Sequence, residues 1–123
     1  HGPYLQKPCF FIEVGSTEKE WNDEKACKAI AETILEIEER RTYEVAIGIG
    51  GGHYAPRFTD IALKGNEAFG HIAARYVVEY LNEEMLEKMI EATPNCKKAY
   101  FHGKYSEIEK FLEKAGIKIA KSV

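Results

Sequence analysis

Several classes of protein are excluded by what this sequence lacks. Its 123 residues include only three cysteines, Cys9, Cys27 and Cys96, and no Cys-x-x-Cys pair. This odd, widely spaced set argues against both a disulfide framework and a thiolate zinc site, and it fits a reducing compartment. No apolar run reaches the roughly 18 residues that a membrane-spanning helix needs, and no basic-then-apolar leader opens the chain. We therefore expect a cytoplasmic protein with no membrane partner.

A strong net charge is also missing, and glutamine is nearly absent. The formal net charge is -3 and the sequence pI is about 5.8, so any contact with nucleic acid has to come from a local basic patch. Gln6 is the only glutamine, whereas Glu, Lys and Ile are abundant, a bias typical of proteins from heat-loving organisms. The chain opens at His1-Gly2-Pro3 without an initiator Met, from which we expect a piece of a longer protein.

The residues that are present predict one α/β domain over 1–123. Hydrophobic residues make up 45% of the chain and charged residues 30%, a balance typical of a globular protein with a core. The segment 68–81 shows both helical and strand spacing, and we favour a helix there, or a short strand running into one. Elsewhere, periodicity and capping signals predict strands over 8–15, 43–49, 98–102 and 117–120, and helices over 22–40, from Asn82, and from a Ser106/Glu109 capping box. Strands that alternate with helices imply a three-layer α/β/α fold with a mainly parallel or mixed sheet.

The most informative feature is the segment Gly48–Asp60, which follows an apolar strand. Gly50, Gly51 and Gly52 let main-chain N–H groups approach a ligand closely, and ligands of parallel sheets bind beyond the carboxyl ends of the strands. His53 supplies a base or a metal ligand, while Arg57 and Asp60 supply a fixed cation and a carboxylate. The alternative is a glycine-rich turn whose polar residues satisfy one another.

Several familiar chemistries do not fit this segment. A histidine stands where a dinucleotide fingerprint needs its third glycine, and neither Gly-Lys-Ser/Thr nor Gly-x-Ser-x-Gly is present. What remains is acid and base catalysis or an open catalytic zinc held by histidine and carboxylate. The donors available are His1, His53, His71, His102, Glu13 and Asp60, and each histidine has an alternative structural reading as a hydrogen-bonded residue. The guanidinium of Arg57 suits a phosphate or a carboxylate.

Four stretches also resemble one known family. They are Gly50-Gly51-Gly52-His53-Tyr54-Ala55-Pro56-Arg57-Phe58-Thr59-Asp60, and His1-Gly2-Pro3 ahead of Phe11-Ile12-Glu13-Val14-Gly15-Ser16-Thr17-Glu18-Lys19-Glu20-Trp21, with Phe69-Gly70-His71-Ile72 further on. This pattern is similar to the archaeal and plant type of D-aminoacyl-tRNA deacylase, and the chain resembles its carboxyl-terminal half. The resemblance implies a phosphorylase/hydrolase-like fold and cleavage of the ester between a D-amino acid and the 3′ end of tRNA, with zinc as an associated cofactor.

Taken together, the residues and the resemblance give a set of candidate positions. The predicted partner is the acceptor end of D-aminoacyl-tRNA, and the chain is expected to be a monomer or a homodimer. The candidates are His53, Asp60 and His71 for catalysis, Gly50, Gly51, Gly52, Tyr54, Arg57 and Thr59 for substrate binding, and His1, Glu13 and His53 for zinc.

Two other functions remain open at this point. The first is a non-catalytic tRNA-binding portion, with the reactive groups elsewhere in a longer protein. The second is a small-molecule metallohydrolase of aminopeptidase type, suggested by the same histidines and carboxylates.

Overall fold

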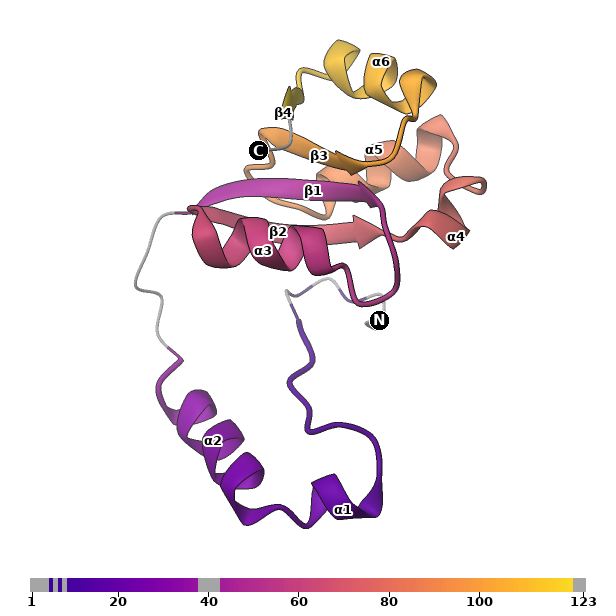
Figure 1. Ribbon diagram of the computed structural model, residues 1–123. Coiled ribbons are helices and arrows are strands. Elements are labelled where there is room, and N and C mark those ends of the chain that lie inside the picture. Colours follow the sequence, from indigo (N-terminus) through magenta and orange to yellow (C-terminus); the bar gives the residue numbers. More distant parts are fainter. Residues whose placement is uncertain (1–4, 6, 8, 38–42, 121–123) are drawn as a thin grey trace. The chain divides into compact units, whose positions relative to one another are not determined.

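The computed structural model describes residues 5, 7, 9–37 and 43–120 (Figure 1). The chain divides into two compact units, His1–Arg41 and Thr42–Val123, and we describe each by itself.

The first unit is helical in its described part. It contains α1 (Glu18–Trp21) and α2 (Glu24–Leu35). Asp23 caps α2 by accepting hydrogen bonds from the backbone N–H groups of Lys25 and Ala26, at 2.9 and 3.1 Å. The amide of Asn22 instead donates to the Glu18 carbonyl at 2.7 Å, at the end of α1. The predicted helix over 22–40 therefore begins two residues late, because Asp23 takes the capping role, and it ends early, at Leu35, with Glu36 at its C-cap. Its predicted residues 38–40 lie outside the described part.

The predicted strand over 8–15 is wrong for its described residues. Cys9–Gly15 form no strand, and Phe10 and Phe11 are 70% and 65% exposed. A strand needs a neighbour to satisfy its backbone N–H and C=O groups, and the described residues of this unit offer only helices. Glu13, one of the predicted zinc ligands, is exposed.

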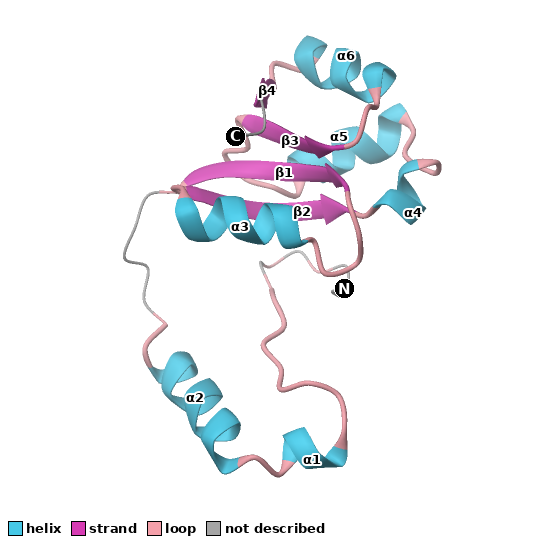
Figure 2. Cartoon of the chain, in the orientation of Figure 1, coloured by secondary structure: helices cyan, strands magenta, loops and turns pink. Residues whose placement is uncertain are grey.

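The second unit is a four-stranded parallel sheet with helices in every crossover (Figure 2). Its strand order is β2-β1-β3-β4. The strands are β1 (Glu44–Gly50), β2 (Glu67–Ala73), β3 (Lys98–His102) and β4 (Lys118–Ala120), and the helices are α3 (Pro56–Lys64), α4 (Arg75–Val78), α5 (Glu83–Glu91) and α6 (Ser106–Lys114). The α/β class and the parallel sheet are confirmed. Parallel neighbours require such crossovers, because a hairpin cannot join strands that run the same way.

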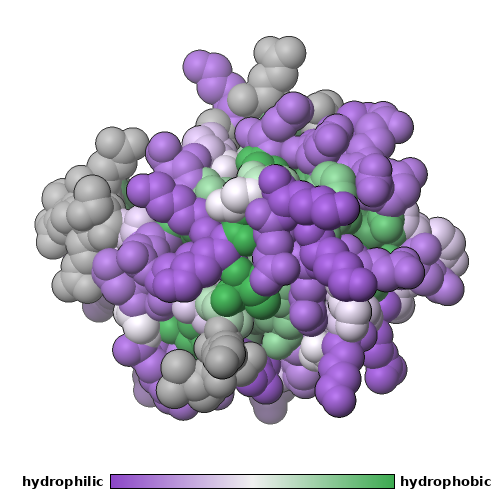
Figure 3. Space-filling view, turned by 90° about the horizontal axis from the view of Figure 1, so that it is seen from above, coloured by the Kyte–Doolittle hydropathy of each residue, from purple (hydrophilic) through white to green (hydrophobic). Residues whose placement is uncertain are grey.

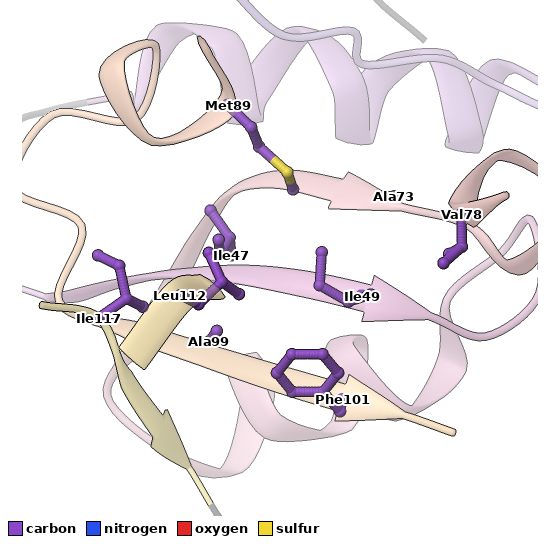
Figure 4. Packing of buried hydrophobic residues seen from close by; sticks show 9 residues of the cluster. All are labelled: Ile47, Ile49, Ala73, Val78, Met89, Ala99, Phe101, Leu112 and Ile117. Atoms are coloured by element: carbon purple, nitrogen blue, oxygen red, sulfur yellow. The ribbon is translucent and has the colours of Figure 1, made fainter. Parts of the chain in front are cut away.

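Hydrophobic clusters on both faces of the sheet make it the middle of three layers. Alternate residues of β1 face opposite ways, so Ala46 packs with Phe58 of α3 while Ile47 and Ile49 pack on the other side. Figure 4 shows Ile47 and Ile49 beside Met89 of α5, Val78 of α4 and Leu112 of α6. In the space-filling view of Figure 3, hydrophilic side chains cover most of the visible surface, with hydrophobic ones showing between them.

A bulge in β2 changes which way its side chains point. Ala46 pairs with Phe69 but the next residue, Ile47, pairs with His71, so Gly70 is an extra residue in β2. Phe69 consequently packs toward α3, 5.3 Å from the ring of Phe58, while His71 shares the opposite face with Ile47. Simple alternation would have put Phe69 and His71 on one face.

The remaining predicted elements can be compared with these bounds. Strands over 43–49, 98–102 and 117–120 and the helix opening at Asn82 are confirmed within about one residue. The helical reading of 68–81 is wrong; its alternative, a strand running into a short helix, is what β2 and α4 form. Ser106 is the first residue of α6 rather than its cap, because Tyr105, with extended φ of -138°, takes that position. No helix in the described ranges is long and apolar enough to cross a membrane.

Candidate active site

The carboxyl ends of β1 and β3 meet at a tightly packed glycine turn. Gly50 and Gly51 have φ of 91° and 79°, a left-handed region that other residues adopt only with strain. A Cβ on Gly50 would overlap the carbonyl oxygen of His102 and lie 2.9 Å from the Tyr105 ring. These two glycines allow the chain to leave the sheet alongside β3. They set the position of the loop over residues 50–55, the glycine loop, which joins β1 to α3.

His53 lies on this loop and is paired with α4. Its Nδ1 is 3.4 Å from the hydroxyl of Tyr76, and its ring meets that of Tyr54 edge to face, with centroids 5.1 Å apart. The start of α4 is tied to the same loop, since the backbone N–H of Arg75 donates to the Gly51 carbonyl at 2.9 Å. His53 and Tyr54 are both exposed, so the imidazole and the phenol are open to a ligand.

Helix α3 begins just beyond His53. Ala55 has φ of 45° and precedes Pro56, which opens the helix. The Thr59 hydroxyl donates to the Ala55 carbonyl at 3.2 Å, so its hydrogen is used inside the helix. Among the described residues, the Nε of Arg57 is buried without a hydrogen-bond partner. A buried donor that is left unpaired carries a desolvation cost of about 1–3 kcal/mol, which an acceptor from a ligand would offset.

Two of the predicted catalytic residues lie away from the loop itself. Asp60 is one turn along α3 and forms an exposed ion pair with Lys64 at 3.7 Å. His71 lies inside β2, where its Nδ1 is 2.8 Å from the Thr93 hydroxyl. The structure thus places His53 at the carboxyl end of the sheet, Asp60 on α3 and His71 on β2.

Three neighbours surround the loop, and two of them, Tyr76 and Tyr105, were not among the candidates for the site. Tyr76 comes from α4, Tyr105 precedes α6, and the His102 Nδ1 would be 3.0 Å from a Cβ on Gly51. His102 was a candidate donor at the end of the predicted strand over 98–102. The pairing of Gly50 with His102 in the register of β1 and β3 is what brings it to the loop. No local motif pointed to the two tyrosines.

The predicted zinc ligands do not assemble into a site in the part of the chain that the structure describes. No group of three or more His, Cys, Asp or Glu side chains there has the arrangement of a metal site. His1 lies outside the described residues, and Glu13 belongs to the other unit. Of the three predicted ligands, His53 is thus the one that lies in the described part of the second unit, whereas a catalytic zinc needs three protein ligands.

The main charge network lies at the opposite end of the sheet, where the strands begin. Lys98 is paired with Glu44 and, at 3.5 Å, with Glu67, all at the amino ends of their strands. The hydroxyl of Tyr100 donates to Glu67 at 2.8 Å, and burial, followed by this hydrogen bond and the charge of Glu67, raises the pKa of Tyr100 to about 12. Burial also raises the pKa of the Cys96 thiol, which makes it a poor nucleophile. These groups therefore stabilise the sheet rather than belong to the glycine-loop site.

Comparison with known proteins identifies the family. The family model described as D-aminoacyl-tRNA deacylase matches residues 1–120, nearly the whole chain. The chain belongs to this family. It is 50% identical over 97 residues to the D-aminoacyl-tRNA deacylase of Thermococcus kodakarensis, covering 76% of this chain and 35% of that protein. It is 41% identical over 111 residues to that of Pyrococcus furiosus, covering 89% of this chain and 41% of the relative.

One solved structure has a fold similar to that of this chain. The crystal structure of a conserved protein of unknown function superposes with a TM-score of 0.78 at 36% identity, over 88% of this deacylase-family chain and 41% of that one. The chain thus spans about a third to two fifths of the length of the curated relatives that it matches. The relatives are archaeal, as the sequence comparison with that type of deacylase predicted.

Proposed function

We propose that the protein hydrolyses the ester bond between a D-amino acid and the 3′ end of tRNA, and that the glycine loop carries the chemistry. The observation that supports this most is the family match over residues 1–120, which includes the whole Gly50–Asp60 segment. An aminoacyl-tRNA substrate also fits the cytoplasmic compartment expected from the sequence.

In this proposal His53 is the general base. It takes a proton from a water molecule, the water oxygen attacks the ester carbonyl carbon, and the carbon–oxygen bond to the ribose then breaks, with a proton passing to the ribose oxygen. The Tyr76 hydroxyl, 3.4 Å from Nδ1, orients the imidazole. Backbone N–H groups of Gly50–Gly52 stabilise the negative charge that develops on the carbonyl oxygen.

Arg57 and Tyr54 are proposed to hold the tRNA end. The unpaired, buried Nε of Arg57, beside the start of α3, suits a phosphate or another anion of the terminal nucleotide. Tyr54 is 88% exposed, and its ring offers a stacking surface for a base. Thr59 contributes its oxygen as an acceptor only, because its hydrogen is bonded to Ala55.

The test compares deacylation of D-tyrosyl-tRNA and L-tyrosyl-tRNA by the full-length protein and its His53→Ala variant. We expect D-selective cleavage, with kcat in the variant reduced roughly 10²–10⁴-fold, the range for loss of a general base, and tRNA binding retained. Unchanged turnover in the variant with intact binding would favour the alternative of a tRNA-binding portion whose reactive groups lie elsewhere. Cleavage of peptides without tRNA would favour the aminopeptidase-type alternative.

Zinc enters this proposal through a separate arm of the same assay. Metal analysis of the purified protein, and chelator treatment of the wild type and of His53→Ala, test whether a metal ion participates in the reaction. Loss of activity on chelation that zinc restores would assign the water activation to a metal site that includes residues beyond the described set.

A further inference from the structure

A chain of hydrogen bonds joins His71 in β2 to the end of α5. The Nδ1 of His71 is 2.8 Å from the Oγ1 of Thr93, and this Oγ1 is 2.8 Å from the Met89 carbonyl oxygen. Thr93 is only 2% exposed, whereas His71 is exposed. One imidazole nitrogen thus faces a buried hydroxyl, and the other belongs to a ring that reaches the surface.

The end of α5 decides where the Thr93 hydroxyl hydrogen points. The last carbonyls of a helix lack partners within the helix and need other donors. The backbone N–H of Thr93 bonds to the Ile90 carbonyl at 3.0 Å, so the Thr93 hydroxyl is the group that donates to the Met89 carbonyl. A hydroxyl has a single hydrogen, and therefore it can only accept from His71.

This direction fixes the tautomer of the imidazole. Because Thr93 accepts, the His71 Nδ1 carries the hydrogen, and the neutral ring presents the lone pair of Nε2 as its acceptor. In the reverse tautomer, two lone pairs would face each other across 2.8 Å. His71 pairs with Ile47, three strand positions before Gly50, so it lies roughly 10 Å along the sheet from the start of the glycine loop.

The bulge at Gly70 makes this contact possible. If residues 69, 70 and 71 alternated regularly, with no bulge, His71 would share the α3 face with Phe69 instead of facing the end of α5. A Cβ on Gly70 would overlap the methyl group of Thr93 and come within 3.1 Å of its Oγ1. Gly70 and Thr93 thus act together to aim the ring.

We propose that Thr93 is a positioning residue for His71, which it holds as the Nδ1–H tautomer so that Nε2 is a hydrogen-bond acceptor for an O–H or N–H donor of the substrate. The substrate part of this statement rests on the proposed deacylase function. The tautomer part depends only on the hydrogen bonds described above.

The tautomer is measured by NMR on the full-length protein labelled with ¹⁵N at the histidine rings, at a pH where the ring is neutral. The His71→Gln variant assigns the His71 signals. We expect the wild type to carry its hydrogen at Nδ1, Thr93→Val to shift His71 toward the Nε2–H form, and Thr93→Ser to keep the wild-type pattern. An Nε2–H tautomer in the wild type would overturn the proposal. This result comes from the wild-type protein, so it does not depend on whether the Thr93 variants fold.

Deacylation of D-tyrosyl-tRNA then tests the role toward substrate. Loss of one ordinary hydrogen bond corresponds to roughly a two- to tenfold effect, so we expect a fall of this size in kcat for Thr93→Val and its rescue in Thr93→Ser. Wild-type kcat and KM in both Thr93→Val and His71→Gln would overturn the role. If the wild type itself shows no D-selective cleavage, the proposed function fails, while the NMR result still decides the tautomer.

Discussion

The three consecutive glycines at the end of β1 should respond to alanine in a graded order, with Gly50 the most sensitive. At Gly50 the added Cβ meets two obstacles, a φ of 91° and overlap with the backbone carbonyl of His102. The first costs about 1–2 kcal/mol, and the second, a steric overlap that no rotamer can relieve, adds about 1–3 kcal/mol. We therefore expect Gly50→Ala to lower the free energy of unfolding by about 2–5 kcal/mol, a large share of the stability of a domain of this size.

Gly51 and Gly52 supply matched controls one and two residues away. Gly51 has φ of 79°, but its Cβ would approach only the His102 ring, at 3.0 Å, and this side chain can turn aside. Gly51→Ala should therefore cost only the backbone strain, about 1–2 kcal/mol. A Cβ on Gly52 would meet nothing within 4 Å, so Gly52→Ala should change stability by less than about 0.5 kcal/mol.

Urea unfolding followed by far-ultraviolet circular dichroism measures this series. With a slope of about 2 kcal/mol per molar urea, a loss of 3 kcal/mol moves the midpoint by about 1.5 M. Equal midpoints for Gly50→Ala and Gly52→Ala, at an unchanged slope, would refute the geometry that we assign to the turn. Equal midpoints would also contradict the close packing of the turn against His102 and Tyr105.

Three further outcomes follow from contacts described above. Between pH 10 and 12 an unfolded tyrosine loses its proton while Tyr100, with its pKa raised to about 12, keeps it, so stability should fall with rising pH by about 2–3 kcal/mol. Denaturant unfolding measured across this pH range should show that the free energy of unfolding falls less with pH in Tyr100→Phe than in the wild type. The same pH dependence in both proteins would contradict the raised pKa of Tyr100. Phe58→Ala should cost about 3–5 kcal/mol in the same assay because Phe58 is 1% exposed, whereas Leu63→Ala on the same helix, at 79% exposure, should cost under about 0.5 kcal/mol. Tyr76→Phe should lower kcat/KM for D-tyrosyl-tRNA roughly fivefold, the equivalent of one hydrogen bond of about 1 kcal/mol, and Tyr80→Phe serves as the exposed control that should leave it unchanged.

Much of the architecture was readable from local patterns. The strands over 43–49 and 98–102 are short apolar runs, and both are confirmed because a strand buried on two faces needs such a run. Asn82 caps α5 as predicted, with its side chain accepting from the Met85 N–H at 2.9 Å. Local patterns misled in the predicted strand over 8–15, whose described residues 9–15 form no strand, because pairing depends on a neighbouring strand that no local pattern reveals.

The candidate site likewise combines features that the sequence predicted with features that only the structure shows. The sequence by itself determined the α/β class with a mainly parallel or mixed sheet and the glycine loop with His53 and Arg57, because periodicity and backbone freedom are properties of the chain alone. The family was recognised from the resemblance of particular stretches, and the family model matches residues 1–120. Tertiary structure alone decided that Tyr76 meets His53, that Tyr105 and His102 pack on Gly50 and Gly51, and that the Gly70 bulge turns His71 toward Thr93. These contacts join residues 22–55 positions apart, and they exist because strand register and one extra residue in β2 bring separate elements together.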